Sequence, residues 1–432
     1  MQNASLYLDN ATPNAEAARR RAVLAVIIGN GFEWFDFISY SFFAIIIAKL
    51  FFPVGDRNIS LLLSVSTVGV GFLMRPVGGL ILGNLADKAG RKVALTITIL
   101  LMTMGTALIS FAPTYQQAGL LAPAIIVLAR LLQGFSAGGE MGGATAYLMD
   151  RVPGAQRGYY TSWIQASIGF AIILSAALGT WILNYLSAAQ IESWGWRVPF
   201  LVGLMLGPVG MYIRSNLVES DRVERSAAES APLFDILRNG GLPILLGFGL
   251  VIFWTVCSYV LLFYIPTYAV KALKLQSSAG FIAVLVGASI VLVVTPFIGH
   301  LSDRFGRKPF LVGATIAAIV LAYPLFAYIN RQPSLASLML FQLVFGLVIA
   351  CYEGPVLAAI SELFPARIQS TGICIAYNLA VITFGGFSAT IITWAIASTH
   401  NNLAPAVYVI VTASLSLVAA IAWRPAPAHE LS

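Results

Sequence analysis

Apolar segments about as long as a membrane is thick follow one another along almost the whole chain, with short polar stretches between them. A hydrocarbon core of about 30 Å needs about 20 residues of α-helix. Gly and Pro occur inside the segments, as membrane helices tolerate. Twelve segments reach this length, at residues 22–48, 59–86, 92–112, 121–148, 161–186, 197–213, 242–270, 277–301, 309–329, 334–361, 370–396 and 404–424. The pattern therefore predicts an all-α membrane protein with twelve transmembrane helices.

The longest internal polar stretch, residues 214–241, separates the sixth apolar segment from the seventh. Its charge and serine content are typical of a cytoplasmic linker. We therefore expect two six-helix bundles, residues 22–213 and 242–424, with cytoplasmic tails at residues 1–21 and 425–432, most of the first tail being disordered. The first apolar segment is too long for the core of a signal peptide, which predicts a retained membrane helix.

Composition supports lipid as the solvent for most of the exterior. Hydrophobic residues make up 59% of the chain and charged residues 10%, against about 25% charged residues in an ordinary soluble domain. The net charge of +7 does not indicate a nucleic-acid partner, because membrane proteins hold Lys and Arg in cytoplasmic loops. Seventeen such residues fall on the side of the termini and six on the other. We therefore expect a multi-pass protein of the cell (inner) membrane with both termini in the cytoplasm.

A charged decapeptide occurs twice, 216 residues apart: "GNLADKAGRK" from Gly83 and "GHLSDRFGRK" from Gly299. Each copy joins the second and third helix of its predicted bundle. A second repeated motif follows the fourth helix of each bundle, where "DRVPGAQRG" and "ELFPARIQSTG" both carry an acid, then a proline, then an arginine. Such repeats predict two structurally related halves, a common construction in transporters.

These motifs resemble those of a known superfamily. The repeated loop is similar to the signature of the major facilitator superfamily. The stretches "NGFEWFDF", "GFLMRPVGG", "ARLLQGFSAGGE", "GYYTSW" and "WGWRVPF" resemble its metabolite:proton symporter family, and most of all the citrate and tricarballylate type. The resemblance extends from about Gly29 to Ala422. It implies two bundles that rock about a central site. We also expect the protein to function as a monomer.

The resemblance also implies a gate at the cytoplasmic ends of the helices. There a carboxylate of the loop can accept N–H bonds from a neighbouring helix N-terminus, and the arginine of the loop can pair with the acid below the fourth helix of its bundle. Several such contacts together would close the inner side. The expected gate residues are Asp87, Arg91, Asp150, Asp303, Arg307 and Glu362.

Ionisable residues inside the bilayer are costly and persist mainly where they pair or line water. Asp36 shares a predicted face of the first helix with Glu33 and Tyr40, and Arg130 shares one of the fourth helix with Gln133 and Glu140. The Asp36–Arg130 pair resembles the acid and arginine that couple protons in sugar symporters of the superfamily. A static buried ion pair is the alternative, although such pairs stabilise poorly. Glu33 and Glu140 are further candidate proton carriers.

Further polar residues inside the predicted helices are candidate substrate ligands. Arg75 either binds a substrate carboxylate or has a structural role, including snorkelling to the cytoplasmic surface. Glu353 is either a second protonation site or the partner of a cationic substrate group. The full candidate binding set is Arg130, Tyr40, Gln133, Gln165, Arg75, Glu353, Tyr377 and Asn378.

These patterns favour proton-coupled symport of a small organic acid, such as a di- or tricarboxylate, by alternating access. Two alternatives remain open: proton-coupled uptake of a zwitterion such as betaine or proline, and proton antiport that exports a drug or toxic anion. An enzyme is not expected, because the loops carry no nucleophile–base constellation and no nucleotide-binding loop. The three cysteines show no metal-binding spacing, and we expect neither a metal nor a cofactor.

Overall fold

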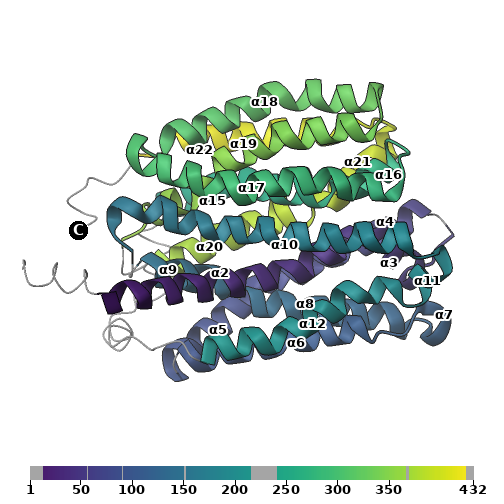
Figure 1. Ribbon diagram of the computed structural model, residues 1–432, viewed down its shortest axis with the longest axis horizontal. Coiled ribbons are helices and arrows are strands. Elements are labelled where there is room, and N and C mark those ends of the chain that lie inside the picture. The colour runs from purple at the N-terminus through teal and green to yellow at the C-terminus, as the bar shows by residue number, and fades with distance from the viewer. Residues whose placement is uncertain are drawn as a thin grey trace, which may run out of the picture.

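The fold is a set of long helices that run side by side along the longest axis of the molecule (Figure 1). The structure is a computed structural model that describes residues 13–55, 57–89, 91–149, 152–215, 241–365 and 369–424. None of these described residues forms a strand. The described chain begins with α2 and ends with α22 at the same end of the molecule, which we call the termini face. The other end, where α3, α7, α11 and α16 lie, is the opposite face.

Helices of the N-terminal half occupy one side of the molecule in Figure 1. They are α2 (Pro13–Phe42), α3 (Ala44–Phe51), α4 (Arg57–Leu73), α5 (Arg75–Ala89), α6 (Arg91–Ser110), α7 (Tyr115–Ala118), α8 (Leu121–Ala137), α9 (Glu140–Met149), α10 (Arg157–Tyr185), α11 (Ala188–Ser193) and α12 (Val198–Ser215), with short 3-10 turns at Gly154–Gln156 and Gly195–Arg197.

Helices of the C-terminal half occupy the other side. They are α15 (Gly241–Ser258), the π-helical turn η4 (Tyr259–Phe263), α16 (Ile265–Lys271), α17 (Ser277–Phe305), α18 (Lys308–Arg331), α19 (Leu335–Ser361), α20 (Gln369–Ala380), the π-helical turn η5 (Val381–Gly386), α21 (Ser388–Thr399) and α22 (Ala404–Ala422).

Every one of the twelve predicted spans is helical, and several are broken. The first span bends by 65° between its two parts, α2 and α3. The seventh and eleventh pass through π-helical turns, η4 and η5. The helix α2 begins at Pro13, so residues 13–21 of the expected tail are helical rather than disordered, and their place in the cytoplasm stays a prediction. Residues 15–21 are all alanine, glutamate or arginine, which are strong helix formers.

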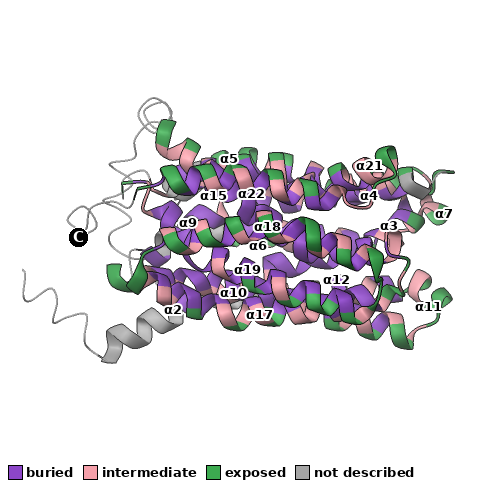
Figure 2. Cartoon of the chain, turned by 90° about the horizontal axis from the view of Figure 1, so that it is seen from above, coloured by how far each residue is buried: buried purple, intermediate pink, exposed green. Residues whose placement is uncertain are grey.

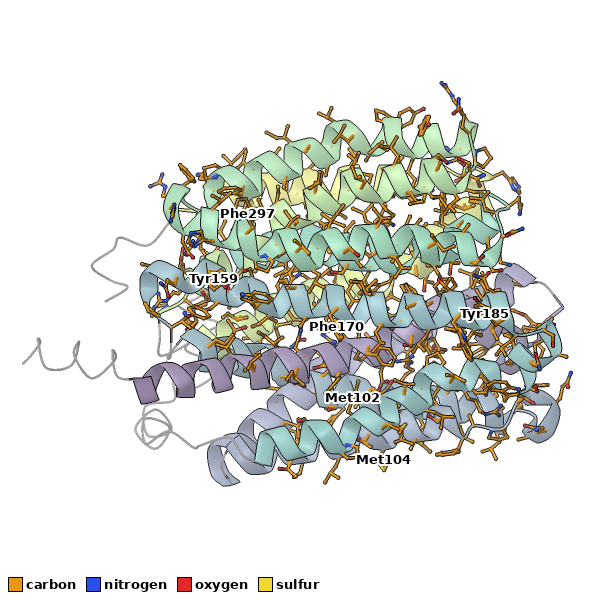
Figure 3. The ribbon with its side chains drawn as sticks, viewed as in Figure 1. Met102, Met104, Tyr159, Phe170, Tyr185 and Phe297 are labelled. Atoms are coloured by element: carbon orange, nitrogen blue, oxygen red, sulfur yellow. The ribbon has the colours of Figure 1, made fainter. Side chains whose placement is uncertain are left out.

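The described helices have the length and surface of membrane spans. Nine helical segments are long and apolar enough to cross a bilayer, or ten when the bent pair α2–α3 is included. Large apolar side chains such as Phe170, Phe297 and Tyr185 are exposed on the sides of the molecule (Figure 3). Buried residues lie inside and between the helices (Figure 2). This pattern confirms the all-α membrane fold.

The two halves meet along two seams. In the first, α10 packs against α17 so closely that a Cβ on Gly158 would lie 2.7 Å from the carbonyl oxygen of Gly299. In the second, α4 packs against η5 and α21, and α9 packs against α20. Small residues at such contacts let helix backbones approach each other. The candidate site lies between these seams.

Candidate functional site

Arg75 lies in an aromatic box at the boundary between the two halves. It opens α5 just after the break in the second span, and its side chain is only 2% exposed. Its guanidinium carbon lies 4.3 Å from the ring centre of Phe72, 5.5 Å from Phe37 and 6.0 Å from Tyr377. Its Nη2 also lies 3.8 Å from Oε1 of Glu33. The snorkelling interpretation is therefore wrong: cation–π and ionic contacts hold the side chain inside the protein.

Arg130, the second buried arginine, lies on α8 and is fully buried. Its guanidinium carbon stands 3.7 Å from the ring centre of Tyr40. Tyr40 is held in turn by a hydrogen bond of 2.5 Å between its hydroxyl and Thr67. The Nη1 of Arg130 donates to Oε1 of Gln133 at 2.7 Å. Tyr40 and Gln133, both predicted on the same helix faces as the charges, thus surround Arg130.

Asp36 and Arg130 do not form the direct ion pair that we expected, although both side chains are described. A chain of two neutral side chains joins them instead. Gln133 Nε2 donates to Thr106 Oγ1 at 3.1 Å, and Thr106 Oγ1 donates to Asp36 Oδ2 through a short hydrogen bond. Because Arg130 donates to Gln133, every bond in the chain points toward Asp36. This direction stabilises a negative charge on Asp36.

Both arginines keep a pair of donor atoms that make no hydrogen bond to the described residues. The Nε and Nη2 atoms of Arg75 and of Arg130 are buried and have no hydrogen-bond partner in the described part of the chain. Leaving buried polar groups unsatisfied costs about 1–3 kcal/mol each, more when they are charged. The Nε–Nη2 edge of a guanidinium is a fork that matches a carboxylate in a bidentate pair. These two edges are the clearest ligand-binding features of the centre.

The C-terminal half contributes an acid and an aromatic pair. Glu353 on α19 is 1% exposed and accepts a hydrogen bond of 3.0 Å from Ser258 on α15. The ring centre of Tyr377 lies 5.0 Å from that of Trp254 and faces Arg75 across the boundary. A buried carboxylate beside aromatic rings can carry a proton or accept a cation.

The two remaining predicted ligands are Asn378 and Gln165. Asn378 donates from Nδ2 to the carbonyl oxygen of Gly138 at 3.2 Å, so here it joins α20 to the N-terminal half. Gln165 on α10 is fully buried, and neither of its amide atoms has a hydrogen-bond partner among the described residues.

Aromatic residues close the space between the halves near the centre. The ring centre of Trp34 lies 5.9 Å from that of Tyr259 and 6.0 Å from that of Phe263. Phe72 reaches Tyr259 at 5.6 Å. Nearer the opposite face, a hydrogen bond of 3.1 Å joins Ser66 of α4 to Thr390 of α21. These contacts join the two halves between the centre and the opposite face.

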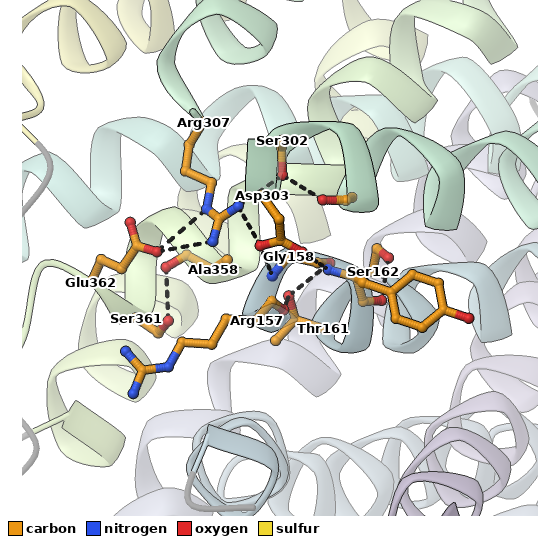
Figure 4. A network of polar contacts seen from close by, with 12 residues as sticks. Arg157, Gly158, Thr161, Ser162, Ser302, Asp303, Arg307, Ala358, Ser361 and Glu362 are labelled. Atoms are coloured by element: carbon orange, nitrogen blue, oxygen red, sulfur yellow. Dashed lines mark hydrogen bonds and ion pairs between the residues drawn. The ribbon is translucent and has the colours of Figure 1, made fainter. Parts of the chain in front are cut away.

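At the termini face, Asp303 joins the two halves (Figure 4). Its two carboxylate oxygens accept the backbone N–H groups of Gly158 and Tyr159, each at 2.9 Å. These N–H groups belong to the first turn of α10, which has no side-chain cap of its own at Gln156. Asp303 of α17 therefore caps a helix of the other half and complements its dipole.

Arg307 ties this cap to α19. Its Nη1 donates to Asp303 Oδ1 at 2.6 Å, and its Nη2 donates to Glu362 Oε1 at 3.3 Å. Burial raises the pKa of Glu362, and the charge of Arg307 opposes that rise. We call the three side chains of Asp303, Arg307 and Glu362, with the first turn of α10, the lock. The expected contacts of Asp303 and Arg307 are thus present in the structure.

The contacts of the remaining expected gate residues lie outside what the structure describes. Asp150 is outside the described residues, and the side chains of Asp87 and Arg91 are not described. Over the described residues, no group of three His, Cys, Asp or Glu side chains is arranged to hold a metal ion.

Sequence reasoning did not select Thr106, which carries the last bond to Asp36. A usable signal was present: Thr103, Thr106 and Ser110 are hydroxyl residues at helical spacing in an otherwise apolar span. Trp34 and Phe72 were also not selected, because aromatic residues in membrane helices are too common to indicate a site.

The parallel helices, the two halves and the polar centre between them define a membrane transporter, and comparison with known families agrees. The profile of the Major Facilitator Superfamily matches residues 26–295, and that of the Sugar (and other) transporter family matches residues 219–424. The chain belongs to the major facilitator superfamily, as its motifs indicated.

Two relatives among characterised proteins illustrate its position in the superfamily. A "Citrate-proton symporter" of Klebsiella pneumoniae is 35% identical over 94% of this chain and 92% of its own length. A "Proline/betaine transporter" of Escherichia coli (strain K12) is 33% identical over 94% of this chain and 83% of its own length. Relatives of this kind confirm the resemblance to the metabolite:proton symporters and support a transporter rather than an enzyme.

Solved structures show the same fold. The crystal structure of a D-xylose-proton symporter superposes with a TM-score of 0.73 at 20% identity, over 95% of this chain and 99% of the other. A structure of the proton:xylose symporter XylE bound to 6-bromo-6-deoxy-D-glucose gives a TM-score of 0.76 at 17% identity, over 94% and 95% of the two chains. The all-α fold predicted from the apolar segments is therefore confirmed.

Proposed function

We propose that this protein is a proton-driven symporter that imports a small organic acid with two or three carboxylates. The observation that carries the proposal is the pair of Nε–Nη2 edges on Arg75 and Arg130, whose atoms have no hydrogen-bond partner among the described residues, although Nη2 of Arg75 lies 3.8 Å from Glu33. Both guanidinium groups lie over the ring of Phe37, at 5.5 and 5.6 Å from its centre. The two guanidinium carbons are therefore no further apart than the sum of those two distances. On this proposal, one small molecule with two or three carboxylates binds both edges.

The hydrogen-bond chain supports coupling between substrate and proton. Asp36 is stabilised as an anion because Arg130, Gln133 and Thr106 all donate toward it. When a substrate carboxylate draws Arg130 toward itself, Gln133 loses its donor and the chain weakens. Asp36 then favours the protonated form. Binding of the acid and uptake of a proton thus assist each other, as symport requires.

Transport would proceed by alternating access. The bundles of residues 22–213 and 242–424 would rock against each other, opening either the lock or the aromatic contacts of Trp34 with Tyr259 and Phe263. We place the termini face in the cytoplasm, because Lys and Arg of the predicted loops are concentrated there. On this orientation the molecule is an inner-membrane protein that works as a monomer, with the acid, protons and lipid as its only partners.

A second candidate is proton-coupled uptake of a zwitterion such as betaine or proline. The buried carboxylate of Glu353 and the neighbouring rings of Trp254 and Tyr377 favour it. Aromatic rings and a carboxylate are the groups that bind quaternary ammonium. A relative is named as a proline/betaine transporter. In this case one arginine would bind the single carboxylate, and Glu353 would face the cationic end.

Uptake into proteoliposomes tests both candidates. Radiolabelled citrate, tricarballylate, succinate, betaine and proline are offered outside, with an imposed pH gradient that is acidic outside. We expect accumulation of a di- or tricarboxylate that collapses with a protonophore, and alkalinisation of a lightly buffered outer medium. Accumulation of betaine or proline alone would replace the first candidate with the second. Substrate-driven acidification of the medium would indicate antiport and overturn both.

The matched variants are Arg75→Lys and Arg130→Lys. Lysine keeps the positive charge but lacks the bidentate fork. We expect each variant to raise the half-saturating concentration of the acid by about tenfold or more, as loss of one charged hydrogen bond would give. Unchanged half-saturation in both variants would count against carboxylate binding at these edges.

A further inference from the structure

A small cavity lies inside the N-terminal half, away from the boundary between the halves. It has a volume of about 50 Å³ and is lined by α2, α6, α12 and the junction of α8 and α9. Such a space can hold water when its walls are polar. The polar walls are the carboxyl groups of Glu33, Asp36 and Glu140 and the hydroxyl groups of Thr98, Thr103, Thr106 and Ser136.

The unpaired oxygen of Asp36 faces this cavity. Its Oδ1 atom has no hydrogen-bond partner among the described residues, and a Cβ on Gly203, a cavity wall, would lie 2.1 Å from it. The other oxygen, Oδ2, is held by Thr106. The side of Asp36 that can exchange a proton is therefore directed into the N-terminal half.

All four lining elements indicate that the cavity extends from Asp36 toward the termini face. Along α2, Gly29 precedes Asp36 by seven residues, or about 10 Å at a rise of about 1.5 Å per residue, and α2 begins at that face. Along α6, which also begins there, Thr98 precedes Thr106. In the helices that run the other way, Glu140 follows Ser136, and Gly207 follows Gly203.

Electrostatics also separates this route from the centre. Toward the substrate position, Thr106 and Gln133 join Asp36 to the positive charge of Arg130, which repels a passing proton. The cavity instead offers the carboxyl group of Glu140 and that of Glu33, whose Oε1 also lies 3.8 Å from Nη2 of Arg75. Glu140 is only half-buried, whereas Asp36 is 4% exposed. A proton leaving Asp36 thus meets the half-buried carboxyl group of Glu140 in one direction and the fully buried charge of Arg130 in the other.

We propose that the proton leaves Asp36 through this cavity, within the N-terminal half, while the substrate leaves between the halves. The proton passes from Asp36 to cavity water and the carboxylates of Glu33 and Glu140, and reaches the termini face without crossing the substrate site. This inference rests on the proposed proton symport. It assigns Thr103, Gly203 and Gly207 as positioning residues that keep the route open, a role that substrate binding does not require of them.

Filling the cavity tests the route. A Cβ on Gly207 would lie 2.6 Å from the hydroxyl of Thr103, so Gly207→Val narrows the space between them. Exchange of labelled for unlabelled substrate at equal pH leaves the proton bound throughout, whereas net uptake requires its release. For Gly207→Val we expect net uptake to fall by about tenfold, as a barrier raised by one lost hydrogen bond would give, with exchange within about twofold of wild type.

Met205→Val is the matched control, because Met205 lies on the same helix and is 74% exposed. It should change neither rate. Thr103→Val adds no volume and removes one hydroxyl group, so it should also lower net uptake more than exchange, by a smaller factor than Gly207→Val. This variant keeps the test valid if Gly207→Val does not fold. Citrate, or the acid identified by the uptake assay, is the probe.

The outcomes distinguish the route from the function itself. The route would be overturned if, in both variants, net uptake and exchange fell together or both stayed unchanged. In that case wild type would still move protons with substrate, so the symport proposal would stand. Wild type that takes up substrate without moving protons would instead overturn the symport proposal on which the route rests.

Discussion

At the scale of single residues, Asp36 and Arg130 influence each other through two neutral side chains rather than by contact. Gln133 and Thr106 each donate one bond toward Asp36. A direct buried ion pair would be strongly destabilised by removing either charge. Because two neutral side chains stand between the charges, Arg130 can move while Asp36 keeps its hydrogen bond from the hydroxyl group of Thr106. Substitutions of the neutral members should therefore alter coupling while both charges remain.

The Asp36→Asn variant should abolish uphill accumulation and retain exchange. The amide fills the same space but cannot exchange a proton with the cavity, so a pH difference of one unit, which supports about tenfold accumulation per proton, should no longer have an effect. The measurement is the ratio of internal to external substrate at steady state in proteoliposomes. A ratio equal to that of wild type would remove Asp36 from the coupling mechanism.

The Gln133→Met variant should uncouple transport although Asp36 and Arg130 are both present. Methionine is similar in size but provides neither the acceptor for Arg130 nor the donor to Thr106. We expect steady-state accumulation close to that of Asp36→Asn, and no further loss in the double variant, because groups in one network are not additive. Gln342→Met is the control, since Gln342 is equally buried but donates to the carbonyl of Leu261. Full additivity in the double variant would argue for independent roles.

The sequence predicts charged members of the site better than neutral ones. Arg307 and Glu362 were predictable partners because a charge inside or beside a membrane needs a partner, and the repeat indicates where to look. Thr106 has no such signal, since a hydroxyl group in a helix can bond its own backbone. The depth of Arg75 was also not predictable, because the break before α5 directs its side chain inward and leaves no mark in the hydropathy pattern.

At the scale of elements, the lock is a contact between the end of α17 and the beginning of α10. The helix α17 ends at Gly306, whose φ of +86° is a left-handed conformation that glycine adopts without strain. This ending places Asp303 on the last turn of α17 and Arg307 just beyond it, at the N-cap of α18, where both meet the other elements. The helices themselves were predictable from apolar length alone, but the π-helical turns η4 and η5 were not, because one extra residue per turn does not alter hydropathy.

The Asp303→Asn variant should weaken closure at the termini face. Asparagine keeps one acceptor oxygen but loses the charge and the second acceptor, which we expect to cost about 1–3 kcal/mol. The measurement is the spin–spin distance between labels at the exposed positions Gln156 and Arg424, in a chain without its native cysteines. The population with long distances should increase. Arg304→Gln, an exposed neighbour, is the control, and an identical distance distribution for Asp303→Asn would refute the lock.

At the scale of the whole molecule, we expect the substrate to bind groups of the N-terminal half and to bring the C-terminal half against that half. Arg75 and Arg130 belong to the N-terminal half, and Tyr377 of the other half faces Arg75. A ligand that fills both arginine edges satisfies buried donors that are otherwise unpaired. It should therefore stabilise the folded protein as a whole.

Thermal unfolding in detergent measures this effect. A ligand at 100 times its dissociation constant stabilises by about 2.7 kcal/mol, so citrate or a related acid should raise the Tm in a concentration-dependent way. Arg75→Gln and Arg130→Gln should lose most of this rise. A rise with betaine but not with any di- or tricarboxylate would favour the zwitterion.

The lock has a consequence for how this contact evolves. Asp303 recognises two peptide N–H groups of α10, and every amino acid except proline supplies such a group. The identity of the side chain at position 159 is therefore free to drift without weakening the bond, so covariation between aligned positions should not reveal it. Proline at position 158 or 159 would delete a partner group outright, so the contact should appear in related chains as an absence of proline at both positions. Position 158 is restricted further, because a Cβ there would lie 2.7 Å from the carbonyl oxygen of Gly299.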